Sequence, residues 1–145
     1  MHPYPHLYSV QAQAVVEGDV TLQSTDLPPL ASAPPPEFDG PGGRWSPETL
    51  LVAAMADCFV LSFRAVARAS KLEWQSLEAS VEGKLDRVDG KTTRFTEFHV
   101  HATLRVPAGT DLARATTLLE KAEKVCLISN SLNGERHLHP TVLAG

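Results

Sequence analysis

The chain has 145 residues, of which 43% are hydrophobic and 21% charged, as is typical of a globular protein with a single domain, here residues 1–145. The net charge of −4 and the lack of a basic run argue against a nucleic-acid partner. No uninterrupted run of about 18 apolar residues and no signal-peptide pattern are present, so we expect no membrane span and a cytoplasmic protein with reduced cysteines.

The N-terminal part predicts two strands and a long loop. Apolar and polar residues alternate from Tyr8 to Val16, which predicts a half-buried strand, and a turn at 17–19 leads into a returning strand at 20–23. Residues 25–45 contain six prolines and three glycines, a density that predicts a loop without regular elements. A loop of this length inside a compact domain is usually functional or disordered.

A long helix follows over residues 46–72. Ser46 suits the N-cap, Pro47 the first helical position and Glu48 the first turn. The helix is apolar nearly all round, which predicts a central element covered on several sides. Cys58 lies in its middle, on a side that we expect to be buried.

The rest of the chain predicts a hairpin, a helix and a strand. Alternating residues at 77–85 and 98–106 flank the turn sequence VDGK. A second amphipathic helix spans about 111–132 and ends at an Asn-Gly step. Residues 137–144 form a short closing strand, which Pro140 places at a sheet edge. The order ββ–α–ββ–α–β predicts the α+β class.

Four histidines raise the question of a metal site. They form two pairs with i, i+2 spacing, His99 with His101 and His137 with His139, and four imidazoles could bind zinc. The first pair shares its strand face with Glu97 and other polar residues, which is typical of a solvated sheet surface. We therefore expect no metal and no cofactor.

The two cysteines are the remaining candidates for chemistry. Cys58 and Cys126 are 68 residues apart, each in an apolar helix on the side that we expect to be buried. Two such helices packed together could bring the thiols near disulfide range, with Cα atoms about 4.4–6.8 Å apart. That pair suits a thiol peroxidase, in which one thiolate becomes a sulfenic acid and the second thiol condenses with it. Two unrelated core cysteines are the alternative.

Two segments resemble signatures of the OsmC/Ohr family of organic hydroperoxide reductases. "SPETLLVAAMADCF" resembles the start of that family's first helix, and "AEKVCLISNSLNG" resembles its second cysteine motif. The element order agrees as well, so the resemblance covers nearly the whole chain, with OsmC-like members favoured over strict Ohr proteins. It implies the OsmC-like fold, an intertwined homodimer in which two long central helices pack against sheets.

The resemblance also implies an activity. It is the reduction of alkyl or fatty-acid hydroperoxides to alcohols without flavin, haem or metal, with a dithiol or a lipoylated protein as reductant. Cys58 would be the peroxidatic thiol and Cys126 the resolving thiol, joined in a disulfide after turnover. Glu48 matches the carboxylate that orients an arginine beside the thiolate. Since Glu48 lies ten residues from Cys58, roughly 15 Å along a straight helix, we expect it to serve the partner chain's thiol.

The chain departs from the family pattern at two places. Cys126 is followed by Leu127 where the family has proline, and no arginine precedes Arg44. OsmC-like members carry arginine where this chain has Glu37. Arg44 is therefore our candidate for the catalytic cation that stabilises the thiolate, four residues before Glu48 and close enough to pair with it. The alternative is a non-catalytic member that binds a small apolar ligand at the dimer interface.

Overall fold

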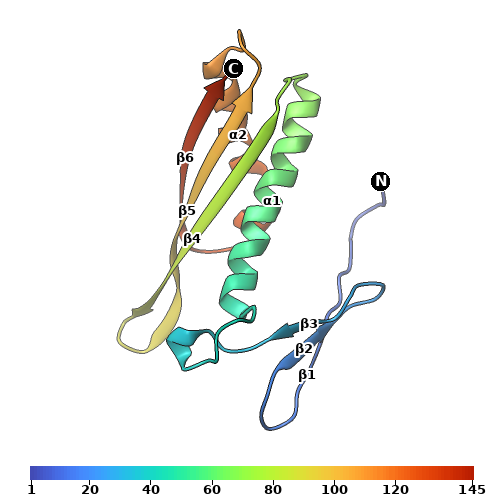
Figure 1. Cartoon of the computed structure of the whole chain (residues 1–145), viewed down its shortest axis with the longest axis vertical. Coiled ribbons are helices and arrows are strands. Elements are labelled where there is room, and N and C mark those ends of the chain that lie inside the picture. Colours follow the sequence, from blue (N-terminus) through green and yellow to red (C-terminus); the bar gives the residue numbers. More distant parts are fainter. The chain divides into compact units, whose positions relative to one another are not determined.

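A computed structural model describes all 145 residues, which divide into two compact units, residues 1–51 and 52–145 (Figure 1). The mixed α+β class is confirmed. The expectation of one domain over the whole chain stays a prediction. The elements follow one another as β1 (Gln11–Gln13), β2 (Val20–Gln23), β3 (Leu30–Ser32), η1 (Pro36–Phe38), α1 (Pro47–Ala69), β4 (Ser76–Val88), β5 (Thr92–Val106), α2 (Leu112–Val125), α3 (Leu127–Asn130) and β6 (Glu135–Ala144).

The first unit contains a small antiparallel sheet in the order β1-β2-β3. The strand expected from Tyr8 to Val16 is much shorter, because β1 pairs with β2 only from Gln11 to Gln13 and β2 itself has four residues. All three residues of β1 are exposed, so the half-buried strand that the alternation predicts does not form within this chain.

The Pro/Gly-rich segment was expected to hold no regular element, and this is wrong. β3 forms between Pro28-Pro29 and a run of three prolines at 34–36, and it bonds to the free edge of β2. Prolines are compatible with an edge strand because its outer N–H groups need no partner. The strand is prolonged by a bridge from Ser32 to Trp45, and the Ala33 amide donates to the Trp45 carbonyl at 2.9 Å.

Helix α1 begins and ends as its sequence predicts, within a few residues. The Thr49 amide donates to Ser46 Oγ at 3.1 Å, and the Ser46 amide donates to Thr49 Oγ1 at 2.9 Å. This reciprocal pair caps the helix as a capping box does, with threonine in the usual place of glutamate. After Ala69 the chain turns at Lys71, whose φ of 55° is incompatible with a continuing helix.

By length and composition α1 could cross a membrane, with a mean hydropathy of 1.9 over its best 18-residue window. The core helix of a globular protein passes the same test, and the buried residues of α1 include Met55, Phe59 and Phe63. The absence of a membrane partner stays a prediction.

The second unit is built on a three-stranded sheet in the order β4-β5-β6. The predicted hairpin is confirmed: β4 and β5 are antiparallel and turn at Asp89 and Gly90, whose φ angles of 53° and 65° fit a type I′ turn. β6 runs parallel to β5 and is an edge strand, as Pro140 predicts, although it starts two residues earlier than expected.

A bulge between Lys84 and Leu85 shifts the register of the hairpin by one residue. On the turn side Leu85 pairs with Phe95, and beyond the bulge Lys84 pairs with Glu97, so Thr96 is the additional residue. Phe95 and Phe98 consequently lie on the same side of the sheet, and their rings stack with centroids 5.4 Å apart.

The core of this unit lies between the sheet and the helices. Alternate residues of β5 are buried from Phe98 onward, and the opposite row, which includes His99 and His101, faces away from them. Both α1 and α2 bury an apolar stripe, and we place both stripes against this inner face (Figure 1). The largest fully buried side chains of the unit are Phe59, Phe63, Phe98, Met55, Leu104, Leu119, Val100 and Val106.

The second helix is interrupted, contrary to the expectation of one helix over 111–132. Cys126 has an extended conformation, with φ −64° and ψ 107°, and separates α2 from α3. Asn130 supports the break, because its Nδ2 donates to the Lys124 carbonyl at 3.1 Å while its own amide donates to the Cys126 carbonyl at 3.0 Å. The side-chain bond satisfies the Lys124 carbonyl, which the residue 128 amide would bond in a continuous helix, and the bond to Cys126 is the ordinary helical bond of α3.

Candidate functional site

Cys58 lies in an open groove of about 480 Å³ in the second unit. It is half-buried, and its Sγ is 3.9 Å from Ser62 Oγ, one turn further along α1. The expectation that Cys58 is on a buried side of the helix is therefore wrong for the single chain, because the core stripe carries Phe59 and Phe63 instead. The groove is lined by Ala54, Asp57, Cys58, Leu61, Ser62, Ala65, Leu127 and Ile128.

Cys126 is fully buried, as expected, at the extended residue between α2 and α3. Ser129 Oγ donates a hydrogen bond to its Sγ at 3.4 Å. Burial raises the pKa of the Cys126 thiol, the Ser129 hydrogen bonds oppose this shift, and the neighbouring Cys58 thiol adds to it. Cys126 is thus held as a neutral thiol.

The two cysteines, whose pairing the sequence left open, interact with each other in the folded chain. The Cys58 thiol is close enough to change the ionisation of Cys126, and both are free thiols. Leu127, which follows Cys126, lines the Cys58 groove, so α3 adjoins this face of α1. One thiol is reachable from the groove and the other is buried beside it, which is an arrangement suited to two successive oxidation steps.

Glu48 lies in the first unit, at the edge of an apolar cavity of about 520 Å³. Its Oε1 is buried without a hydrogen-bond partner. Val20, Leu22, Phe38 and Leu50 contribute apolar walls. A carboxylate oxygen in such surroundings is costly unless a cation or donor reaches it.

Arg44 does not pair with Glu48, which is a correction to the predicted pairing. Its Nε donates to Asp19 Oδ2 at 2.9 Å, an ion pair that is about half exposed. Asp19 lies in the turn before β2, and no pattern in the sequence pointed to this partner. The role of Arg44 at the thiol stays a prediction.

A second carboxylate near the thiols escaped the sequence analysis. Glu123 is buried in α2, three residues before Cys126, and its Oε1 lies 3.7 Å from Arg136 Nε of β6. Burial raises the pKa of Glu123, and Arg136 and Ser129 oppose that shift. The available signal was its position: Glu123 is four residues after Leu119 and so lies within the apolar stripe of the helix.

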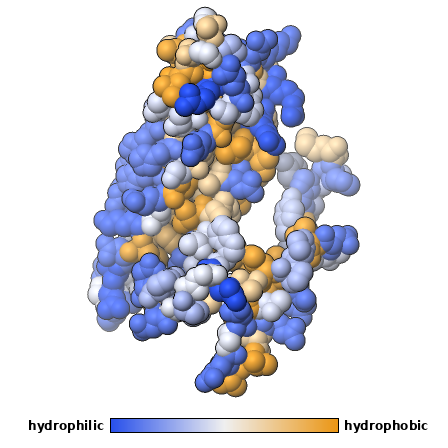
Figure 2. Space-filling view, in the orientation of Figure 1, coloured by the Kyte–Doolittle hydropathy of each residue, from blue (hydrophilic) through white to orange (hydrophobic).

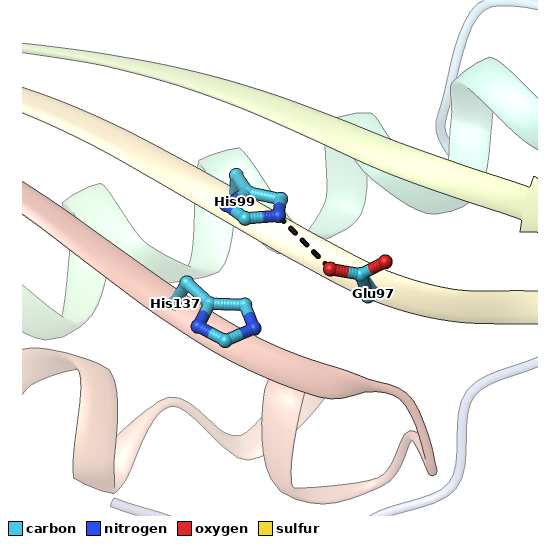
Figure 3. A group of neighbouring side chains, drawn as sticks. All are labelled: Glu97, His99 and His137. Carbon is cyan, nitrogen blue, oxygen red and sulfur yellow. Dashed lines mark hydrogen bonds and ion pairs between the residues drawn. The ribbon is translucent and has the colours of Figure 1, made fainter.

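The histidines predicted to cover a solvated sheet face do lie on that face, but they are gathered rather than dispersed. His99 and His137 stack on neighbouring strands with centroids 4.7 Å apart. With Glu97 they form a group whose ligand atoms all lie within 4.8 Å of one another (Figure 3).

The family model described as OsmC-like protein matches residues 40–138 of this chain. Among characterised sequences, an organic hydroperoxide resistance protein of Xanthomonas axonopodis pv. citri is 32% identical over 136 residues, covering 91% of this chain and 92% of its own length. The uncharacterised protein YmaD of Bacillus subtilis is also 32% identical, over 120 residues, covering 81% of this chain and 79% of its own.

Solved structures agree with these sequence matches. An organic hydroperoxide resistance protein OsmC from Legionella pneumophila superimposes with a TM-score of 0.76 at 28% identity, covering 97% of this chain and 99% of its own. An OsmC-like protein of unknown function from Vibrio cholerae gives a TM-score of 0.85 at 17% identity, covering 94% and 99%. At 17% identity, the likeness to the Vibrio cholerae protein shows the fold alone.

Proposed function

This chain belongs to the OsmC-like protein family, and from that premise we propose that it is a thiol-dependent peroxidase that reduces organic hydroperoxides to alcohols. The observation that carries the proposal is the pairing of a half-exposed Cys58 in an open groove with a buried Cys126 thiol beside it. The names of the hydroperoxide-resistance relatives support the substrate class.

The reaction divides into two steps on these thiols. The Cys58 thiolate attacks the outer peroxide oxygen, the O–O bond breaks, and the alkoxide takes a proton to leave as the alcohol, so that Cys58 becomes a sulfenic acid. The Cys126 thiol then condenses with the sulfenic sulfur, which forms the disulfide and releases water. An external dithiol, free or carried on a lipoylated protein, returns both cysteines to thiols and becomes a disulfide itself.

The groove favours an organic substrate over hydrogen peroxide. Ala54, Leu61 and Ala65 of α1 form apolar walls beside Cys58, and Leu127 and Ile128 add to them. An alkyl or aryl substituent buries apolar surface there, at about 25 cal/mol per Å², whereas hydrogen peroxide has no such group.

We also propose that the protein is a homodimer. Leu61 is 51% exposed on the Cys58 side of α1, and Figure 2 shows hydrophobic residues gathered along this part of the molecule. An apolar stripe on a long helix that is left uncovered within one chain is typical of a subunit interface. A second copy would close the groove and supply further residues to the site.

Glu48 and Arg44 complete the proposed site. Glu48 has an unpartnered buried carboxylate oxygen, and a catalytic arginine is the kind of group that would satisfy it. Arg44 is the candidate, and this role requires it to leave Asp19 or to share it.

Turnover with defined substrates tests the function. We expect cumene hydroperoxide to be reduced at the expense of dihydrolipoamide, with kcat/KM at least about tenfold above that for hydrogen peroxide, because the apolar walls bind only the organic peroxide. Cys58→Ser should abolish turnover. If wild type and Cys58→Ser are equally inactive with both peroxides, the protein is not a peroxidase and the ligand-binding alternative gains support.

A further inference from the structure

The outer face of the second sheet carries a ladder of four histidines, defined as His99, His101, His137 and His139. The parallel register places His99 opposite His137 and His101 opposite His139. The rings stack in sequence, with centroids 4.7 Å apart for His99 and His137, 5.3 Å for His99 and His139, and 4.6 Å for His101 and His139.

One end of the ladder has the composition of a metal site. His99 Nε2 lies 3.4 Å from Glu97 Oε1, and a ring nitrogen of His137 completes a group with ligand atoms within 4.8 Å of one another (Figure 3). Ligands bound to zinc at about 2.0–2.1 Å in a tetrahedron are about 3.3 Å apart, so the pair of His99 and Glu97 is already at that spacing, and His137 lies within 4.8 Å of both.

Lys84 contacts one carboxylate oxygen of Glu97 and leaves the other, Oε1, on the side of the histidines. Lys84 Nζ bonds to Oε2 at 3.1 Å, which holds the carboxylate and neutralises one side of it. Oε1 is the atom that points towards His99.

The second nitrogen of His99 is also satisfied in the way that metal-bound histidines require. His99 Nδ1 lies 3.0 Å from His139 Nε2. If His99 binds a metal through Nε2, its Nδ1 carries the proton and donates to His139, which fixes the ring orientation.

We propose that Glu97, His99 and His137 bind a divalent transition-metal ion, with Zn²⁺ as the fitting ion, on the outer face of the sheet. Two imidazoles and one carboxylate are ligands that zinc takes readily, and solvent can supply a fourth. The site joins β5 to the edge strand β6, which Pro140 deprives of one backbone donor. Metal binding therefore ties the edge strand to the sheet, apart from the thiol chemistry and whether or not the peroxidase proposal holds.

The test is zinc titration of the full chain without an affinity tag. Cys58→Ser/Cys126→Ser serves as the parent protein, because thiolates are themselves zinc ligands. We expect calorimetry with ZnCl₂ to give one ion per chain and the thermal unfolding midpoint to rise with zinc concentration. His99→Gln and His137→Gln should each weaken binding by more than about 100-fold, since changing an outer partner alone costs 10–100-fold.

Two further variants separate the site from the general surface. His139→Gln should weaken binding by about tenfold through the lost contact with His99, and His6→Gln, which changes a histidine of the first unit outside the ladder, should leave binding unchanged. Variants are compared only where their unfolding midpoints in EDTA match the parent. Binding that survives in both His99→Gln and His137→Gln, or no binding by the parent, would overturn the proposal.

Zinc X-ray absorption of the unsubstituted protein gives a readout that needs no ladder variant. Two imidazoles together with oxygen ligands are expected when the first equivalent of zinc is bound. A coordination shell dominated by sulfur would place the ion at the thiols and reject the ladder site.

Discussion

Arg136 Nε of β6 lies 3.7 Å from Oε1 of the buried Glu123 of α2, a contact that joins the edge strand to the helix in front of Cys126. Neither carboxylate oxygen of Glu123 has a close hydrogen-bond partner. Burial raises the pKa of Glu123 from its ordinary value of 4.5, so the folded chain holds this proton more tightly than the unfolded chain. Between the pKa of Glu123 in the unfolded chain and its higher pKa in the folded chain, the free energy of unfolding falls as the pH rises. The loss is complete above the folded pKa.

Glu123→Gln should remove that pH dependence. The variant should gain free energy of unfolding relative to wild type on going from about pH 4 to about pH 7, because only the wild type has a buried carboxyl to ionise. Urea unfolding at several pH values measures the difference. Glu120→Gln, an exposed glutamate on the same helix, is the control and should follow wild type. A difference for Glu123→Gln that is constant with pH would contradict this account.

The two cysteines should respond differently to a single equivalent of cumene hydroperoxide. Cys58→Ser should remain unoxidised, because the remaining thiol is buried and held neutral. Cys126→Ser should take up one oxygen at Cys58 and then fail to recycle, because no second thiol condenses with the sulfenic acid. Mass spectrometry distinguishes these products, and equal loss of the first oxidation in both variants would refute the assignment of roles.

Ser129 should tune the resolving thiol. Its hydrogen bonds oppose the raised pKa of Cys126, so Ser129→Ala should raise that pKa further and slow disulfide formation by roughly tenfold, the equivalent of about 1.4 kcal/mol for one lost hydrogen bond. Stopped-flow measurement of the second step, after sulfenic acid formation, isolates the effect. Ser131→Ala, whose hydroxyl bonds to the Leu127 carbonyl instead, should leave this step unchanged.

Arg44 should control the reactivity of Cys58 if it is the catalytic cation. Arg44→Ala should slow alkylation of Cys58 and peroxide reduction by at least about tenfold, since a lost cation disfavours the thiolate. Arg87→Ala, an exposed arginine in the hairpin, is the matched control. Unchanged rates in Arg44→Ala would assign Arg44 to its observed partner Asp19 and leave the activating cation to be found elsewhere.

A charge on the exposed stripe of α1 should disrupt the proposed dimer. Leu61 is 51% exposed, so Leu61→Glu should fold normally as a single chain but weaken association by more than about 100-fold, because an unpaired charge is costly at an apolar interface. Sedimentation equilibrium measures the oligomeric state. Leu112→Glu, at an exposed position in the first turn of α2, is the control. A wild type that is monomeric at all concentrations would reject the dimer.

The long elements could be predicted from the sequence because their signals are local. The capping pair at Ser46, the apolar content of α1 and the Asp89-Gly90 turn each depend on a few neighbouring residues. β3 could not be predicted, because it forms only where the free edge of β2 offers partners to a segment between prolines. The break at Cys126 was equally hidden, since it depends on the Asn130 side chain bonding back to Lys124 rather than on a proline.

Only part of the candidate site could be predicted from the sequence, for the same reason. The sequence showed that packing of the two helices could bring the thiols together, and Cys58 does lie close enough to affect the pKa of Cys126. The sequence did not reveal that Cys58 lines a groove, that Arg44 bonds to Asp19 or that Glu123 is buried. Each of these features depends on contacts between elements that are distant in sequence.

The bulge at Lys84 and Leu85 decides which chemistry the two faces of the sheet carry. If the bulge were absent and Thr96 paired with Lys84, Gly83 would face Glu97 rather than Phe98, and His99 and His101 would align with the inward residues of β4. Because of this one additional residue, Phe95 and Phe98 lie on the inner face of the sheet and the imidazoles of β5 lie on the outer face. Deletion of one residue after Glu97 would reverse the faces of the rest of β5, whereas deletion of Thr96 would only remove the bulge, so the length of the strand beyond the bulge matters more than any single substitution on its outer face.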